Sequence, residues 1–232
     1  MKKHVALFSS VLMMSTTLLG AGSVFAESVN PEPNSATTSM TAELTLDQTA
    51  TPPTPPVQPG EGGGDEGTNI NGLYGIAYVP KALSGNAQLN ENGSQDINLA
   101  NNSAVKYNVG VQDKTRKNDQ EWTLKAQLNW SNDTNKYMAG ATIKATNGKV
   151  TENKEGELTE LANDEVTTAA KELTIKQGTE TEIMKSTKGK TMNGVYNYQF
   201  DAPKLNIPDV SKVAAGTYSG TINWNLENTP AI

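Results

Sequence analysis

Strict alternation of apolar and polar residues constrains the fold of this chain more than any other feature of its sequence. The segment 121–130 places an apolar residue at every second position: Trp122, Leu124, Ala126, Leu128 and Trp130. The segments 104–111 and 217–226 show the same period of two. Because successive side chains of a β-strand point to opposite faces, this pattern is typical of half-buried antiparallel strands.

Weaker alternation predicts further strands between turn-forming residues. We expect them at 73–79, 141–146, 171–176, 181–185 and 195–200. Asn147-Gly148 and Asn193-Gly194 are typical of hairpin turns. The segment 156–172 departs from the pattern and is expected to form a short helix or an irregular excursion. A domain of about 160 residues buries a core without cross-links, so the sequence predicts an all-β antiparallel sandwich over residues 72–232.

The first 26 residues have the organisation of a secretory signal peptide. Lys2 and Lys3 precede an uncharged apolar stretch that runs to Gly20, and the small residues of a cleavage site end at Ala26. The apolar stretch is shorter than the roughly 20 residues that a membrane-spanning helix needs. The sequence therefore predicts export, with cleavage before Glu27 and no membrane span afterwards.

The composition of the exported chain excludes most catalytic mechanisms. The sequence contains no cysteine, and its only histidine, His4, lies in the predicted signal peptide. A disulfide, a zinc site of the thiolate or histidine type and a histidine-dependent catalytic triad are therefore excluded. Acidic residues are plentiful, which leaves a carboxylate-based glycan hydrolase as one alternative. We predict no enzymatic activity, no metal and no cofactor.

Residues 27–71 differ in composition from the rest of the chain. They are rich in Thr, Pro, Ser and Gly, and they contain seven acidic residues and no basic one. Such a segment buries too little apolar area to offset its ordering entropy, so we expect a long disordered linker. The segment 41–46 alternates, and a short strand that pairs with something else is the second interpretation.

Residues 73–232 are close to electrically neutral, with 18 acidic residues against 17 basic ones. Arg116 is the only arginine. Nucleic acids and anionic membranes are recognised by basic stripes, and none is present in this segment. Binding to a polymer would therefore depend on shape and stacking rather than on net charge.

Two of the predicted strands carry a W-x-L triplet, Trp122-Thr123-Leu124 and Trp224-Asn225-Leu226. Further blocks accompany the triplets in order along the chain: 111–116 ahead of 122–128, then 138–143, and finally 215–230. Together these blocks resemble the WxL-domain family of Gram-positive surface proteins. Glu121, where a glycine often precedes the first Trp, and Asn225, inside the second triplet, depart from the family pattern and leave the resemblance intact.

The resemblance implies a secreted surface protein that binds peptidoglycan non-covalently. It also implies companion WxL proteins and larger membrane-anchored surface proteins as partners. The sequence shows no sorting motif, no hydrophobic tail after residue 228 and no lipoprotein cysteine, which also favours non-covalent retention. One further alternative remains: an adhesin or assembly subunit that binds a protein partner through sheet edges or aromatic patches.

Five apolar residues are the candidate ligand-binding residues: Trp122, Leu124, Trp224, Leu226 and Trp130. Alternation favours a core role for the triplets, more firmly for Trp224 than for Trp122, whereas a Trp ring also suits stacking on a sugar. Trp130 ends its strand outside the triplets and is expected to be the more exposed ring.

Two polar features near these strands have two interpretations each. Asp113 and Arg116 are expected to form an ion pair at a strand end or to contact a ligand. The run 132–135 is expected to form a turn or to bind a cation through its side-chain oxygens.

Overall fold

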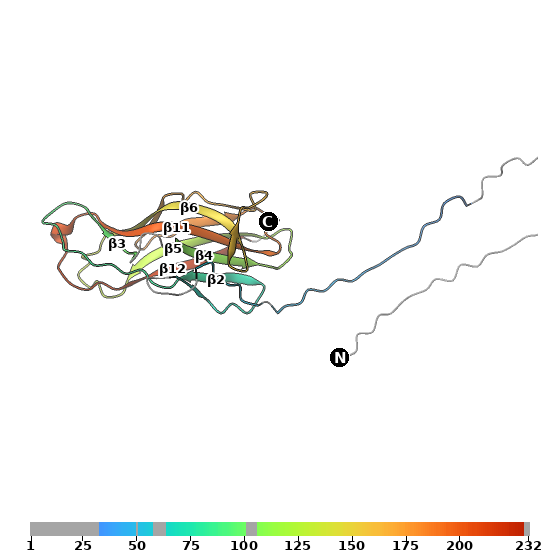
Figure 1. Cartoon of the computed structure of the whole chain (residues 1–232), viewed down its shortest axis with the longest axis horizontal. Helices are drawn as coiled ribbons and strands as arrows, with labels where there is room; N and C mark the ends of the chain where they lie inside the picture. Colours follow the sequence, from blue (N-terminus) through green and yellow to red (C-terminus); the bar gives the residue numbers. More distant parts are fainter. Residues whose placement is uncertain (1–32, 50, 58–63, 101–105, 230–232) are drawn as a thin grey trace, which may run out of the picture. The chain divides into compact units, whose positions relative to one another are not determined.

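The computed structural model describes residues 33–49, 51–57, 64–100 and 106–229 of the protein (Figure 1). The predicted signal peptide and its cleavage site lie outside the described residues. The chain divides into two units, residues 1–45 and 46–232. Residues 33–45 form no helix or strand, and all strands belong to the second unit. A search of the described residues for helices found none with the length and apolarity needed to cross a membrane.

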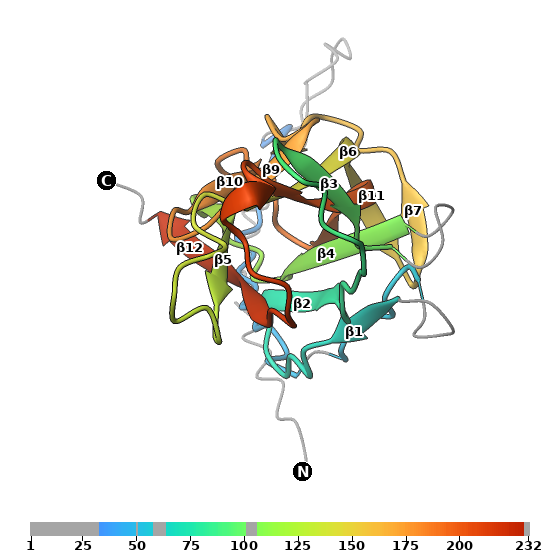
Figure 2. The same ribbon diagram turned by 90° about the vertical axis from the view of Figure 1, so that its left-hand side faces the viewer.

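The second unit consists of two antiparallel sheets (Figures 1 and 2). The small sheet has the strand order β12 (Gly220–Thr229), β5 (Glu121–Trp130), β10 (Thr181–Ser186) and β8 (Val166–Thr167). The main path of the large sheet runs through β1 (Asp65–Gly67), β2 (Tyr74–Pro80), β4 (Lys106–Asp113), β11 (Gly194–Ile207), β6 (Thr142–Lys154) and β7 (Glu157–Thr159).

Two further strands pair at the side of the large sheet, β3 (Gln95–Asn98) with β11 and β9 (Leu173–Lys176) with β6. A 3-10 helix, η1, covers Val210–Lys212. The predicted all-β antiparallel architecture is confirmed, with the large sheet curled into a half-barrel (Figure 2). The segment 156–172 contains β7 and β8 within an irregular excursion, and it forms no helix.

Both predicted Asn-Gly hairpin turns are wrong. Asn147 and Gly148 lie inside β6, at an irregularity of its pairing with β11. Gly148 is required there because a Cβ atom would lie 2.0 Å from the carbonyl oxygen of Ala170. The pair therefore forms a β-bulge, in which Asn147 adopts a positive φ of 55°. Asn193 ends the connection from β10, which belongs to the other sheet, and Gly194 is the first residue of β11.

The main core lies between the concave face of the large sheet and the inner face of the small sheet. Alternate residues of β4 and β11 supply aromatic rings, and the rings of Tyr107 and Phe200 stack with their centroids 5.6 Å apart. The facing side chains of β5, such as Leu124 and Leu128, are buried against them. The core therefore has the two-layer organisation that the alternation predicts.

A second, partly polar cluster lies on the outer face of the large sheet. The Tyr78 ring is completely buried there, and its hydroxyl donates to Asn197 Oδ1 at 3.0 Å. Asn197 Nδ2 in turn donates to Asn108 Oδ1 at 3.1 Å. The ring lies directly over Gly110, where a Cβ atom would be 2.3 Å from the Tyr78 Cζ atom. A glycine at position 110 therefore makes room for the tyrosine.

Residues 54–57 and 64–67, here called the strap, cover this outer cluster. The Asp65 carboxylate is buried and accepts hydrogen bonds from Asn108 N at 2.9 Å, Asn108 Nδ2 at 2.8 Å and Val57 N at 3.2 Å. Asn153 Nδ2 donates to the carbonyl oxygen of Thr54 at 2.8 Å. The strap lies within the range expected to be linker, and we propose that the folded domain begins near residue 54 rather than 72.

Removal of the strap should weaken the domain. A fragment of residues 73–232 leaves the buried polar groups of Asn108 and Asn153 without their hydrogen-bond partners in the strap, whereas a fragment of residues 51–232 keeps them. We expect the shorter fragment to lose about 2–4 kcal/mol of unfolding free energy, the cost of a few unsatisfied buried groups. Urea titration followed by tryptophan fluorescence measures the difference. Equal midpoints for the two fragments would contradict a structural role for the strap.

Asp65 should make stability depend on pH. Burial raises the pKa of Asp65 from 3.8 to about 6. The folded state thus holds the proton more tightly, so the unfolding free energy should fall by on the order of 2 kcal/mol as the pH rises from about 4 to about 6. Asp65→Asn should remove this slope in urea titrations at several pH values. Glu66→Gln, at an exposed carboxylate of the same strand, is the matched control and should retain it.

Candidate functional site

The structure brings the two W-x-L triplets side by side. Strands β5 and β12 pair along their whole length, with Leu124 opposite Leu226 and Ala126 opposite Trp224. Residues directly opposite each other in an antiparallel pair share a face, so both triplets point to the inner face of the small sheet. The two motifs therefore form one structural unit, although about 100 residues separate them in the chain.

Trp122 is the buried anchor of this unit. Its side chain is 0% exposed, and its ring lies 6.0 Å from the ring of Tyr196 on the large sheet. The backbone N–H of Trp122 donates to Ser186 Oγ at 2.8 Å, and the indole Nε1–H donates to Thr191 Oγ1 at 3.1 Å. A buried Trp normally finds a partner for its N–H, and here both of its donors are satisfied.

The hydrogen bonding continues from Trp122 to Asp113. Thr191 Oγ1 donates to Asp113 Oδ2 at 3.0 Å, and Thr115 Oγ1 donates to Asp113 Oδ1 at 2.8 Å. The predicted ion pair with Arg116 is wrong: Arg116 is exposed, and Asp113 is buried among hydroxyl donors. Burial raises the pKa of the nearby Tyr196, and the charge of Asp113 adds to the increase.

Trp224 is less buried than Trp122, which reverses the predicted order. Ile222, Trp224 and Leu226 are half-buried along β12, where they pack against the edge of the core. Their positions differ because β5 lies in the middle of the small sheet, whereas β12 is its edge strand. Leu124, like Trp122, is 0% exposed.

Trp130 is half-buried at the end of β5. Its ring meets the ring of Tyr218 edge to face, with the centroids 6.5 Å apart. The Trp130 Nε1–H is buried and has no hydrogen-bond partner among the described residues. Of the five candidate residues, Trp130, Trp224 and Leu226 are therefore partly accessible, and Trp122 and Leu124 are not.

The outer face of the small sheet carries neutral amide and hydroxyl side chains in neighbouring rows. Gln127 lies opposite Asn223, and Asn129 lies opposite Thr221. Asn129 Nδ2 donates to Gln127 Oε1 at 3.2 Å, and Thr221 Oγ1 donates to Asn223 Oδ1 at 3.2 Å. These four residues, here called the amide face, alternate with inward-pointing apolar residues along the same two strands. The amide face presents donors and acceptors without net charge.

A charged cluster follows the amide face along the same strands. Lys125 Nζ lies 2.6 Å from Glu227 Oε2 and 3.4 Å from Glu180 Oε2, and Asn225 Nδ2 donates to Glu180 Oε1 at 3.0 Å. Hydrogen bonding to Glu227 raises the pKa of Lys125 above its ordinary value. The three charged groups bind one another at the surface.

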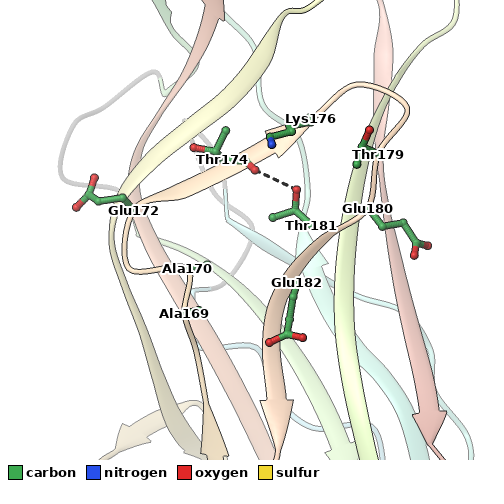
Figure 3. Close-up of a pocket in the computed structure, with 9 residues that line it drawn as sticks. All are labelled: Ala169, Ala170, Glu172, Thr174, Lys176, Thr179, Glu180, Thr181 and Glu182. Atoms are coloured by element: carbon green, nitrogen blue, oxygen red, sulfur yellow. Dashed lines mark hydrogen bonds between the residues drawn. The ribbon is translucent and has the colours of Figure 1, made fainter.

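A shallow groove of about 370 Å³ lies between β9 and β10, beside the charged cluster (Figure 3). Thr181 lies at its centre and donates from Oγ1 to the carbonyl oxygen of Thr174 at 3.1 Å. The charged side chains that line the groove are Glu172, Lys176, Glu180 and Glu182. They give the groove both signs of charge, and the two alanines 169 and 170 supply its small apolar wall.

The run 132–135 forms a turn, as one of its two interpretations predicts. The Asp133 carboxylate accepts hydrogen bonds from the backbone N–H groups of Tyr137 and Met138, at 2.7 and 2.8 Å. Asn132 side-chain atoms fasten the turn to the segment before β12 through Thr217 and Ser219. A search of the described residues found no group of three or more His, Cys, Asp or Glu that could hold a metal ion.

The triplets identified the strands, but the sequence did not indicate the polar groups that complete the site. Ser186 and Thr191 hold Trp122, and neither stands in a recognisable pattern. The amide face had a usable signal, because its residues are the polar half of the same alternation that marked the core face. A search for alternating apolar residues alone does not identify the amide face.

Comparison with protein families places this arrangement in a known class. The model of the WxL domain, described as surface cell wall-binding, matches residues 31–230. The chain belongs to the WxL domain family, and it is a surface protein of the cell-wall-binding type. Comparisons with curated proteins and with solved structures gave no match.

Substitution of the two triplet tryptophans should separate their roles. Trp122→Ala removes a fully buried ring and should lower the unfolding free energy by about 3–5 kcal/mol. Trp224→Ala removes a half-buried ring from an edge strand and should cost about 1–2 kcal/mol. Chemical denaturation followed by far-UV circular dichroism measures both. A larger loss for Trp224→Ala than for Trp122→Ala would contradict the anchoring role of Trp122.

Proposed function

We propose that this protein is a secreted, non-catalytic component of the Gram-positive cell wall that binds peptidoglycan non-covalently through its WxL domain. The amide face forms the contact surface. The partly accessible residues among the predicted ligand-binding set, Trp130, Trp224 and Leu226, lie on the opposite face of the same two strands, where they pack against the core. Trp122 and Leu124 act through the fold by holding β5 in place.

The chemistry of the amide face is the observation that carries this proposal. The glycan strands of peptidoglycan are uncharged N-acetylated sugars, joined to one another by short peptides, so these strands offer hydroxyl, amide N–H and carbonyl groups. Gln127, Asn129 and Asn223 offer both amide donors and carbonyl acceptors, and Thr221 offers a hydroxyl. Strands about 4.8 Å apart hold these groups in a flat array that an extended polymer can follow.

The charge of the domain supports the same ligand. Residues 73–232 contain nearly equal numbers of acidic and basic residues, and Lys125 is already bound by Glu227 and Glu180. A strongly anionic polymer such as a teichoic acid would find no excess positive charge on this face. Companion WxL proteins and membrane-anchored surface proteins are the further partners that we propose from the family.

Peptidoglycan binding should depend on the amide face. Gln127→Ala combined with Asn223→Ala removes two opposite side chains, and binding to purified peptidoglycan stripped of teichoic acid should weaken about tenfold, the effect of one or two lost hydrogen bonds. Asn86→Ala, an exposed amide elsewhere on the domain, is the matched control and should bind normally. Sedimentation of the protein with the insoluble polymer measures the affinity.

The same assay tests the dependence on charge. At 1 M salt the Debye length falls to about 3 Å, so contacts between charges are screened while neutral hydrogen bonds persist. We expect most of the protein to stay bound. Release by salt alone, or normal binding of the double variant, would refute the proposed contact surface.

A further inference from the structure

Strand β12 has an unpaired edge. It pairs with β5 on one side, and it is the terminal strand of the small sheet on the other. Among the described residues, no backbone hydrogen bond is made from this second edge. A ten-residue edge strand with exposed polar residues and half-buried apolar ones can accept another strand.

Residues 40–47 have the pattern of a strand that lacks a sheet. Four apolar residues alternate with four polar ones, in the order Met40, Thr41, Ala42, Glu43, Leu44, Thr45, Leu46 and Asp47. Met40 is 89% exposed and Leu44 is 92% exposed, far above the 37% of the two other large exposed hydrophobic residues among the described ones. Eight alternating residues are enough for a strand of ordinary length. The WxL family match begins at residue 31 and therefore includes this segment.

We propose that residues 40–47 are a donor strand, which adds to the free edge of β12 in a second copy of this protein. An extended segment that adds to a sheet edge gains main-chain hydrogen bonds and places alternate side chains in line with the core face. The proposal concerns assembly between copies, and it does not depend on which wall polymer the domain binds.

An antiparallel register fits the side chains of the two strands. With Leu44 opposite Trp224, Leu46 meets Ile222 and Ala42 meets Leu226 on the inner face. In the same register the acidic residues Glu43 and Asp47 lie opposite Asn225 and Thr221. Like charges directly opposite each other destabilise a sheet, and this register avoids them.

The attachment of the strap favours β12 of a second copy, rather than β12 of the same chain, as the acceptor of residues 40–47. Thr54 is held by Asn153 at the end of β6, next to β7. Figure 2 shows β7 and β12 on opposite sides of the half-barrel. The six residues between Asp47 and Thr54 span at most about 25 Å, so a path to the chain's own β12 would have to go round the domain. A neighbouring copy can present its β12 edge without this constraint.

Engineered cysteines test the proposal directly, because the chain has no cysteine of its own. One preparation of residues 27–232 carries Thr45→Cys, and a second preparation, enlarged by a tag, carries Asn223→Cys. Both positions are on the polar face of their strands and oppose each other in the proposed register, at a separation that a disulfide can bridge. Mild oxidation of the mixture should give the mixed disulfide dimer as the main product.

Two controls make the result specific. Asn86→Cys in place of Asn223→Cys puts an exposed cysteine away from β12 and should reduce the yield of mixed dimer about tenfold. Leu44→Asp added to the Thr45→Cys chain removes the central apolar contact and should reduce the yield by a similar factor of about ten. Because Leu44 lies outside the folded strands, the melting temperature of that variant should remain unchanged.

Each result decides the proposal. A mixed dimer that requires both Leu44 and the β12 cysteine supports strand donation between copies. An internal disulfide in a third chain that carries both Thr45→Cys and Asn223→Cys, with no mixed dimer between the two single-cysteine preparations, would overturn the second copy as the acceptor. Equal yields with the Asn86→Cys control, or no dimer at the highest concentration reached, would overturn the donor strand itself.

Discussion

The burial of Trp122 between the two sheets is the interaction on which the rest of the structure depends. Its ring packs on Tyr196 of the large sheet, while its two N–H groups are bound by Ser186 and Thr191. Thr191 in turn donates a hydrogen bond to Asp113 at the end of β4. Because β5 is fixed in this way, β12 has a defined partner, and the amide face and the free edge follow from that pairing.

The two faces of the small sheet have different roles: the inner face stabilises the fold, and the outer face is the one that we propose to contact the ligand. The W-x-L triplets face inward, so most of the apolar part of the motif stabilises the fold. The amide face lies on the opposite side of the same strands, and it carries the amides and hydroxyls that we propose to contact the wall. A motif defined by its buried residues can therefore mark a binding surface on the opposite face of the same strands.

The sequence predicted the elements that obey a simple period and missed those that do not. Strands β4, β5 and β12 were predicted because one face of each is apolar. The strap was taken for linker because its proline and glycine residues show no periodicity. It docks through the short pairing of β1 with β2, the backbone carbonyl of Thr54 and the carboxylate of Asp65. Asn147-Gly148 was misplaced because an asparagine with a positive φ angle, as at Asn147, occurs in bulges as well as in turns. The partners of Trp122 and Asp113 depend on tertiary contacts that no local pattern contains.

The long-range character of the pairings has a consequence for the order of folding. Tyr78 bonds to Asn197 across 119 positions, and β12 pairs with a strand that precedes it by about a hundred. Neither sheet can close while the last third of the chain is missing. A nascent chain that lacks its last strands would therefore remain unfolded. The domain would fold cooperatively, and only after β12 is available for pairing.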